Sequence, residues 1–171
     1  MRESIRSVTP VFNTHRMVKE YNERLYEPAA AKHRELLADD CAKATEISHW
    51  KTRIRHDWPQ VRISDVHITS EERLTVTVGE TLGVTARVHL GNIDPKFVRV
   101  QAYFGESTNA SIGKASIMDL DDCKKGDHGD YLYDGQIRAT ESGAYGLNVR
   151  VIPVNGMLTQ AHELRLITWA R

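Results

Sequence analysis

The chain has 171 residues, a length that suits one good-sized domain or a small domain with a helical appendage. Lys plus Arg and Asp plus Glu number 23 each, and neither the first 60 residues (11 basic, 9 acidic) nor the rest (12 basic, 14 acidic) has the cationic excess that favours nucleic acids or anionic membranes. Because no apolar run reaches the ~20 residues of a membrane span and no signal-peptide core precedes the first helix, we expect a cytoplasmic protein with no nucleic-acid and no membrane partner.

The first third of the chain has a helical hydrophobic period. Met17, Tyr21 and Leu25 recur every four residues, and Asn13 or Thr14 is a suitable N-cap. Pro28 should end this helix. A second helix is expected from about residue 29 to residue 57, with an apolar stripe of Leu37, Cys41, Ala44, Ile47, Trp50 and Ile54. Two helices cannot bury both stripes alone, so these faces must pack on the following domain or on protein outside this chain.

After Pro59 the hydrophobic period becomes two. Apolar and polar residues alternate clearly over 82–90, 98–104 and 145–151, as in antiparallel strands with one covered face. Weaker strands are expected at 61–69, 73–79, 112–119, 130–139 and 162–169. Glycine, asparagine and proline turns separate these segments at 78–80, 92–95, 126–129, 142–143 and 155–156.

These patterns predict an α+β protein by content, with an N-terminal pair of α-helices followed by an all-β antiparallel sandwich. The sandwich should be of the immunoglobulin or fibronectin-III-like kind. We place the helical segment at residues 1–58 and the β-sandwich domain at residues 59–171. Tyr145 stands before the strongest late strand, where such sandwiches carry a tyrosine corner. An ordinary tyrosine at the edge of the core is the alternative, and either role is structural.

Residue types that carry chemistry are present, but they are not arranged as a site. The eight histidines and the two cysteines, Cys41 and Cys123, lack metal-ligand spacing, and both cysteines are expected to be reduced thiols. Residues 119–130 include five aspartates, which raises calcium as an alternative. Because this spacing does not fit an EF-hand loop and two lysines lie inside it, we prefer a solvated hairpin loop. We expect no catalytic, cofactor-binding or metal residue in this chain.

Aromatic side chains offer one candidate binding feature. Trp50, Trp58 and Trp169 accompany three tyrosines in the strand-forming half, namely Tyr103, Tyr131 and Tyr133. An exposed row of such rings stacks on sugars, so these tyrosines are the candidate sugar contacts. Packing within the core or between elements is the alternative for each of them.

Residues 11–21 read VFNTHRMVKEY. This segment resembles a stretch that follows the pyridoxal phosphate site in bacterial and archaeal α-glucan phosphorylases, the family that includes the glycogen, starch and maltodextrin enzymes. Flanking and C-terminal segments are also similar, at residues 2–5, 26–29, 143–153 and 166–170. The similarity therefore brackets nearly the whole chain.

The resemblance implies a parent enzyme that uses pyridoxal phosphate to phosphorolyse α-1,4-glucans to glucose 1-phosphate. It also implies that this chain lies after the region that holds the cofactor lysine, so no catalytic or cofactor residue carries over. Residues 1–58 would then be closing helices of the catalytic core, with the N-terminal catalytic region as their partner. We expect the chain to be a non-catalytic C-terminal fragment that serves as scaffold or interaction domain.

Two other roles stay open. The sandwich is a carbohydrate-binding module if exposed aromatic rings line one sheet face, which makes α-glucan a partner. Alternatively, the helical segment is a dimerisation module, because its exposed apolar stripe favours homo-oligomers.

Overall fold

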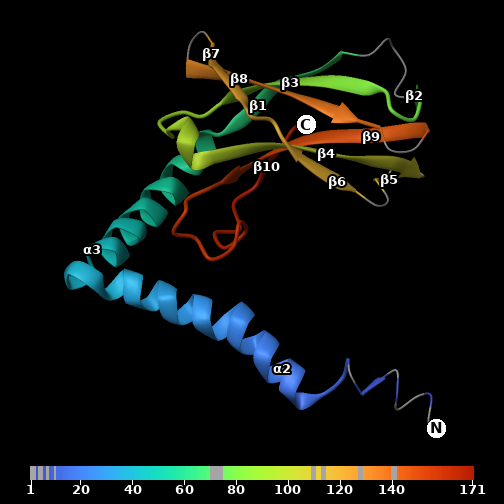
Figure 1. The fold of residues 1–171 in the computed structure, drawn as a ribbon. Coiled ribbons are helices and arrows are strands. Elements are labelled where there is room, and N and C mark those ends of the chain that lie inside the picture. Colours follow the sequence, from blue (N-terminus) through green and yellow to red (C-terminus); the bar gives the residue numbers. More distant parts are fainter. Residues whose placement is uncertain are drawn as a thin grey trace. The chain divides into compact units, whose positions relative to one another are not determined.

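The computed structural model describes residues 3, 6, 8, 9, 11–69, 75–108, 111–112, 115–126, 129–139 and 142–171 (Figure 1). The chain forms two compact units, Met1–Trp50 and Lys51–Arg171. The first unit is helical. The second contains the end of the long helix and the strands. We describe each unit by itself.

The first unit begins with helix α2 (Thr14–Tyr21), which continues through a π-helical turn (Asn22–Tyr26) into α3 (Glu27–Asp57). The side chain of Asn13 accepts a hydrogen bond from the backbone N–H of Arg16 at 2.8 Å, which confirms Asn13 as the N-cap. The predicted helix boundary at Pro28 is wrong, because α3 includes this proline. The π turn just before it explains the tolerance, since a wider turn relieves the clash between a proline ring and the preceding carbonyl groups.

The helix is interrupted instead at Ala38–Cys41. Ala38 is extended, and Asp39, Asp40 and Cys41 follow with φ values of 51°, 54° and 62°. Short polar residues such as aspartate tolerate this left-handed region better than most L-residues. Lys43 and Glu35, on opposite sides of the interruption, form a salt bridge of 3.0 Å. Cys41 is therefore part of a turn and not of a continuous apolar stripe.

In the second unit, α3 ends at Asp57 and a 3₁₀ turn (Trp58–Gln60) leads into the first sheet. This sheet has the order β1-β3-β8-β7 and is antiparallel throughout. Its strands are β1 (Arg62–Thr69), β3 (Thr81–His89), β8 (Asp130–Arg138) and β7 (Asp122–Lys125). The ladder between β1 and β3 shifts register between Ile63 and Asp65, a bulge that bends the edge strand β1.

The second sheet has the order β10-β9-β4-β5, with β2 also paired to β9 and β6 to β4. Its long central strands are β4 (Val98–Thr108), which follows a 3₁₀ turn (Pro95–Phe97), and β9 (Gly143–Pro153). The shorter strands are β2 (Thr75–Val76), β5 (Ser111–Ile112), β6 (Ser116–Asp119) and β10 (Thr168–Trp169). All of these described pairings are antiparallel.

The hydrophobic core comes from the alternate residues of both sheets. In Figure 1 the sheet with β1, β3 and β8 lies over the sheet with β9 and β4. A Cβ atom added to Gly135 on β8 would approach Leu120, just after β6, to 2.5 Å, which shows how closely the two sheets pack there. The fully or nearly fully buried core residues include Val84, Ala86, Val88, Val100, Ala102, Ile137, Val149 and Val151.

Most predicted strands are confirmed, with two corrections. In the segment expected as a strand over 162–169, residues 162–164 form a turn, residues 165–167 are irregular, and only Thr168–Trp169 pairs with β9. Residues 122–125, expected in a loop, form β7. The predicted strand over 73–79 lies partly outside the described residues. None of the helices in the described ranges is long and apolar enough to cross a membrane.

Candidate functional site

A row of interacting side chains crosses four strands of the second sheet. Trp169 on β10 is the register partner of Arg150 on β9, Arg150 faces Gln101 on β4, and Gln101 faces Asp119 on β6. Arg150 Nε donates to Gln101 Oε1 at 2.9 Å, and Gln101 Nε2 donates to Asp119 Oδ1 at 2.7 Å. Gln101 and Arg150 are only 7% and 8% exposed. We call these four residues the cross-strand row.

Two aromatic rings lie at the β10 end of this row. Tyr103 and Trp169 meet edge to face, with ring centroids 5.6 Å apart and an interplanar angle of 87°. The Arg150 guanidinium carbon lies 5.9 Å from the Tyr103 centroid and 5.6 Å from the Trp169 centroid. A cation at these distances is attracted to the negative faces of both rings. The arrangement holds Trp169 in one place while 38% of its surface stays exposed.

Trp169 also lines a cavity of about 400 Å³. On its other side the cavity is bounded by Trp58, which is 6% exposed and whose indole Nε1–H has no hydrogen-bond partner among the described residues. Five of the seven lining residues, namely two tryptophans, a proline and two aliphatic residues, are apolar, and the other two supply polar groups. The lining residues are Trp58, Pro59, Val61, Ile167, Thr168, Trp169 and Arg171. We call this space the tryptophan cavity.

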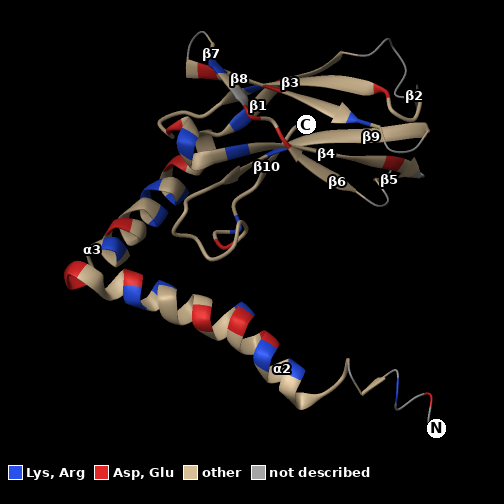
Figure 2. Ribbon diagram, in the orientation of Figure 1, with Lys and Arg blue, Asp and Glu red and all other residues tan. Residues whose placement is uncertain are grey.

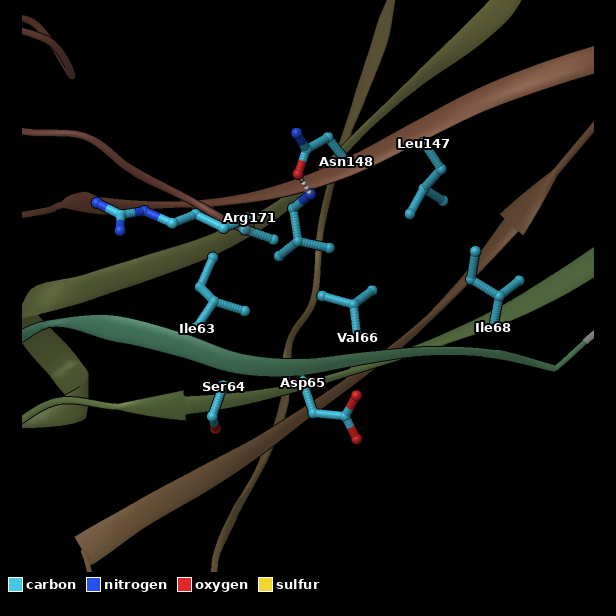
Figure 3. A pocket seen from close by; sticks show the side chains of 10 residues that line it. Ile63, Ser64, Asp65, Val66, Ile68, Leu147, Asn148 and Arg171 are labelled. Carbon is cyan, nitrogen blue, oxygen red and sulfur yellow. Dashed lines mark hydrogen bonds between the residues drawn. The ribbon is translucent and has the colours of Figure 1, made fainter.

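A second cleft, of about 470 Å³, lies between β1 and β9 (Figure 3). Ile63, Val66 and Ile68 point from β1 into this cleft, whereas Ser64 and Asp65 point to the other side of the strand. Opposite them, the Asn148 side chain accepts a hydrogen bond from the Val149 amide at 2.7 Å. Aliphatic side chains of β1 thus line one side of the cleft, and polar groups such as the Asn148 side chain are also part of its lining.

The three candidate sugar-contact tyrosines do not lie on one sheet. Tyr103 is on β4 of the second sheet, whereas Tyr131 and Tyr133 are on β8 of the first. Tyr103 is half-buried beside Trp169, so among the three it is the one that the structure places in an aromatic cluster. Sugar contact by any of these tyrosines stays a prediction.

Tyr133 is almost completely buried, at 4% exposure. Its hydroxyl makes no well-formed hydrogen bond within the described part of the chain. Burial raises the pKa of Tyr133 above its ordinary value of 10.0, and the neighbouring Cys123 acts in the same direction. Tyr145 is also buried, and the tyrosine corner proposed for it stays a prediction.

The acidic stretch at residues 119–130, which we expected to be a hairpin loop, contains β7 and the first residue of β8, and these two strands pair. Gly126 N donates to Asp130 O at 2.8 Å, and the Asp130 carboxylate contacts His89 Nδ1 at 2.9 Å. Asp127 and His128, which belong to the same stretch, lie outside the described residues. Among the residues that are described, no group of three or more His, Cys, Asp or Glu side chains is arranged to hold a metal ion.

The first unit presents an apolar surface of a different kind. Phe12 is 76% exposed and Leu25 is 56% exposed, and five further large apolar side chains between residues 17 and 37 are also exposed: Met17, Val18, Tyr21, Tyr26 and Leu37. Figure 2 shows basic and acidic residues alternating along the same helices. Some of these form pairs one turn apart, such as Arg16 with Glu20 at 3.0 Å. We call the exposed apolar residues the helical stripe.

Sequence reasoning did not identify Arg150, Gln101 or Asp119. Period-two alternation places Gln101 and Tyr103 on the same side of one strand, and Arg150 and Asn148 on the same side of another. However, the register between strands separated by about fifty residues is set by long-range packing, which one sequence does not reveal.

Comparisons with known proteins bear on the whole chain. A family model for the glycogen phosphorylase C-terminal domain matches residues 58–171. The maltodextrin phosphorylase of Thermococcus litoralis is 34% identical over 174 residues, which cover 99% of this chain and 20% of that protein. The glycogen phosphorylases of Mycobacterium bovis and Mycobacterium tuberculosis are each 29% identical over 171 residues with the same coverage.

This chain therefore spans one fifth of the length of the relatives that it matches. Among solved structures, the alkylpurine DNA glycosylase AlkC of Pseudomonas fluorescens, bound to DNA containing an abasic site analog, has a TM-score of 0.37 and 13% identity. That match covers 55% of this chain and 27% of the other, and a superposition of this quality supports no conclusion. The match over residues 58–171 is decisive, and the chain belongs to the glycogen phosphorylase C-terminal domain family.

Proposed function

We propose that this chain is the non-catalytic C-terminal part of a pyridoxal-phosphate-dependent α-glucan phosphorylase and that it serves as scaffold and interaction domain. The observation that carries the proposal is the family match over residues 58–171 together with relatives that align to 99% of the chain. The enzyme as a whole would phosphorolyse glycogen or maltodextrin to glucose 1-phosphate in the cytoplasm.

Two parts have separate roles in this proposal. Residues 1–58 are closing helices of the catalytic core, and residues 59–171 are a β-sandwich of the immunoglobulin or fibronectin-III-like kind. The two antiparallel sheets, which are buried on their facing sides, and the family match from residue 58 onward support this division.

The helical stripe supports a partner for the first part. Large apolar side chains at 45% exposure or more, concentrated on one helical segment, are unusual on a free surface and typical of an interface. We infer that the partner is the N-terminal catalytic region of the same phosphorylase. In its absence, the stripe would drive homo-oligomers through the exposed helices.

Pyridoxal phosphate would be held by that catalytic region. We assign no residue of this chain to the cofactor.

The interface role of the helical stripe is tested by introducing charged residues into it. The isolated chain should bind the dye ANS and sediment as oligomers, because burial of exposed apolar surface is favourable. The double variant Tyr21→Glu/Leu25→Glu should reduce both effects. The matched variant Arg24→Glu, which changes a charge on the same helix without touching the stripe, should leave them intact. A monomeric chain that binds no ANS would contradict the proposed interface.

The non-catalytic role has its own test. The purified chain mixed with pyridoxal phosphate and maltodextrin should give neither Schiff-base absorbance nor phosphate-dependent glucose 1-phosphate. Phosphate-dependent release of glucose 1-phosphate would show that the chain holds its own active centre, whereas a Schiff base alone could form on its exposed lysines.

A further inference from the structure

The tryptophan cavity has the properties of a small ligand site. Its volume of about 400 Å³ lies within the ~300–1,000 Å³ of typical ligand pockets. Ligand pockets are largely apolar with few polar groups, and here the polar groups come from Thr168 and Arg171.

The walls suit a sugar ring better than a purely apolar ligand. A pyranose presents C–H groups on its faces, which are attracted to the negative face of an aromatic ring. Its rim carries hydroxyls, which both donate and accept hydrogen bonds. Arg171 offers several donors in a fixed fork, and Thr168 offers a hydroxyl that donates and accepts.

The cross-strand row makes Trp169 a rigid wall. Arg150 lies over the Trp169 ring at 5.6 Å and is itself fixed by its hydrogen bond to Gln101 at 2.9 Å. Tyr103 meets the same indole edge to face. A side chain that is fixed before binding loses little entropy when a ligand arrives, which favours weak polar ligands such as sugars.

We propose that the tryptophan cavity, with Trp169 and Trp58 as its walls, binds α-1,4-glucan chains. This inference rests on the proposed function, because the matched relatives are named as maltodextrin and glycogen phosphorylases and the whole enzyme would act on such chains. The lining residues of this site all lie within residues 58–171, the part that matches the C-terminal domain family.

The test uses the full chain labelled with ¹⁵N and titrated with maltoheptaose. The three tryptophans give three indole N–H signals, and Trp50, which does not line the cavity, is an internal control. The signals of Trp58 and Trp169 should shift with added maltoheptaose, and the Trp50 signal should not. Cellohexaose, a β-1,4-linked chain, serves as comparison and should shift them at least about tenfold less strongly at equal concentration, since a pocket shaped for one linkage discriminates by this order.

Three variants sharpen the test. Trp169→Ala should abolish the Trp58 shift, and Trp169→Phe, which keeps a ring and the fold, should weaken binding about three- to tenfold. Val78→Ala, an exposed position outside the cavity lining, should bind as the natural chain does.

The proposal is overturned by an absence of indole shifts, by equal shifts with cellohexaose, or by unchanged affinity in Trp169→Phe. Because this readout is independent of the helical stripe, loss of sugar binding alone would leave the scaffold role standing. A cavity that instead became protected only in the assembled enzyme would show that it contacts protein and not glucan.

Discussion

The strongest quantitative prediction concerns the buried pair Arg150 and Gln101. Arg150→Met keeps most of the apolar stem but removes the guanidinium, so the buried Gln101 Oε1 loses its donor at 2.9 Å. An unsatisfied buried acceptor costs about 1–3 kcal/mol. Loss of two cation–π contacts, to Tyr103 and Trp169, adds about 0.5–1 kcal/mol each. The free energy of unfolding should therefore fall by about 2–5 kcal/mol.

The assay is urea unfolding followed by near-ultraviolet circular dichroism, with the midpoint and slope converted to a free energy of unfolding. Gln101→Leu should also lower the free energy of unfolding. The double variant should lose about 1–2 kcal/mol less than the sum of the two single losses, because neither buried side chain is then left without its partner. Arg99→Met is the matched control. Arg99 forms an exposed pair with Asp119 at 3.4 Å, and its loss should cost less than about 1 kcal/mol. Additivity of the two single losses within about 0.5 kcal/mol would refute the account of the row.

Three further predictions concern the fold of the second unit. Ile137→Ala, at a site that is 1% exposed, should lower the free energy of unfolding by about 2–5 kcal/mol in the same urea assay. Gly91→Ala should cost more than about 1 kcal/mol, because φ is +56° and the new Cβ would lie 2.5 Å from Gln60 Oε1; a neutral result would contradict this geometry. The Lys51 ammonium, followed by the Thr159 amide, lowers the pKa of Glu163 below its ordinary value of 4.5. The stability from this pair is complete above pH 4.5 and is lost as the pH falls through the lowered pKa, so Glu163→Gln should reduce the acid-dependent part of a thermal melt recorded against pH.

The sequence predicted most strands because alternation is a local signal. Residues 82–90 and 98–104 alternate without interruption, and the corresponding strands β3 and β4 are central in their sheets. The predicted strand over 162–169 was mostly wrong, because strict alternation is missing there. Its four apolar residues do not alternate strictly, since Leu166 and Ile167 are adjacent, and only Thr168–Trp169 pairs with β9. Pairing at such short edges depends on tertiary packing rather than on local preference.

In the helical segment, too, the sequence did not show where the helix is interrupted. Pro28 predicted a helix end, but the helix continues because a π turn just before the proline relieves its steric clash. The sequence alone does not distinguish a helix that breaks at a proline from one that continues through a bulge. The interruption at Asp39–Cys41 has only weak sequence indications, namely two adjacent aspartates. By contrast, the exposed stripe was predictable, since two helices cannot cover their own apolar faces.

The candidate site was predictable only in part. Tyr103, Trp58 and Trp169 were all among the aromatic residues named from the sequence, but the sequence does not show that Trp58 and Trp169 line one cavity, which depends on the pairing of β10 with β9. Tyr131 and Tyr133 were grouped with Tyr103 because the sequence does not show which sheet each strand joins.

We propose that this chain packs through its helical stripe on the N-terminal catalytic region of an α-glucan phosphorylase and that the enzyme needs this contact for activity. The Thermococcus litoralis maltodextrin phosphorylase, truncated to remove the 20% of its length that matches this chain, should be mixed with this chain or with its own missing fragment. Phosphate-dependent release of glucose 1-phosphate from maltodextrin is then measured. We predict that this chain restores activity and that its Tyr21→Glu/Leu25→Glu variant does not. Restoration by the enzyme's own fragment but not by this chain would contradict the claim.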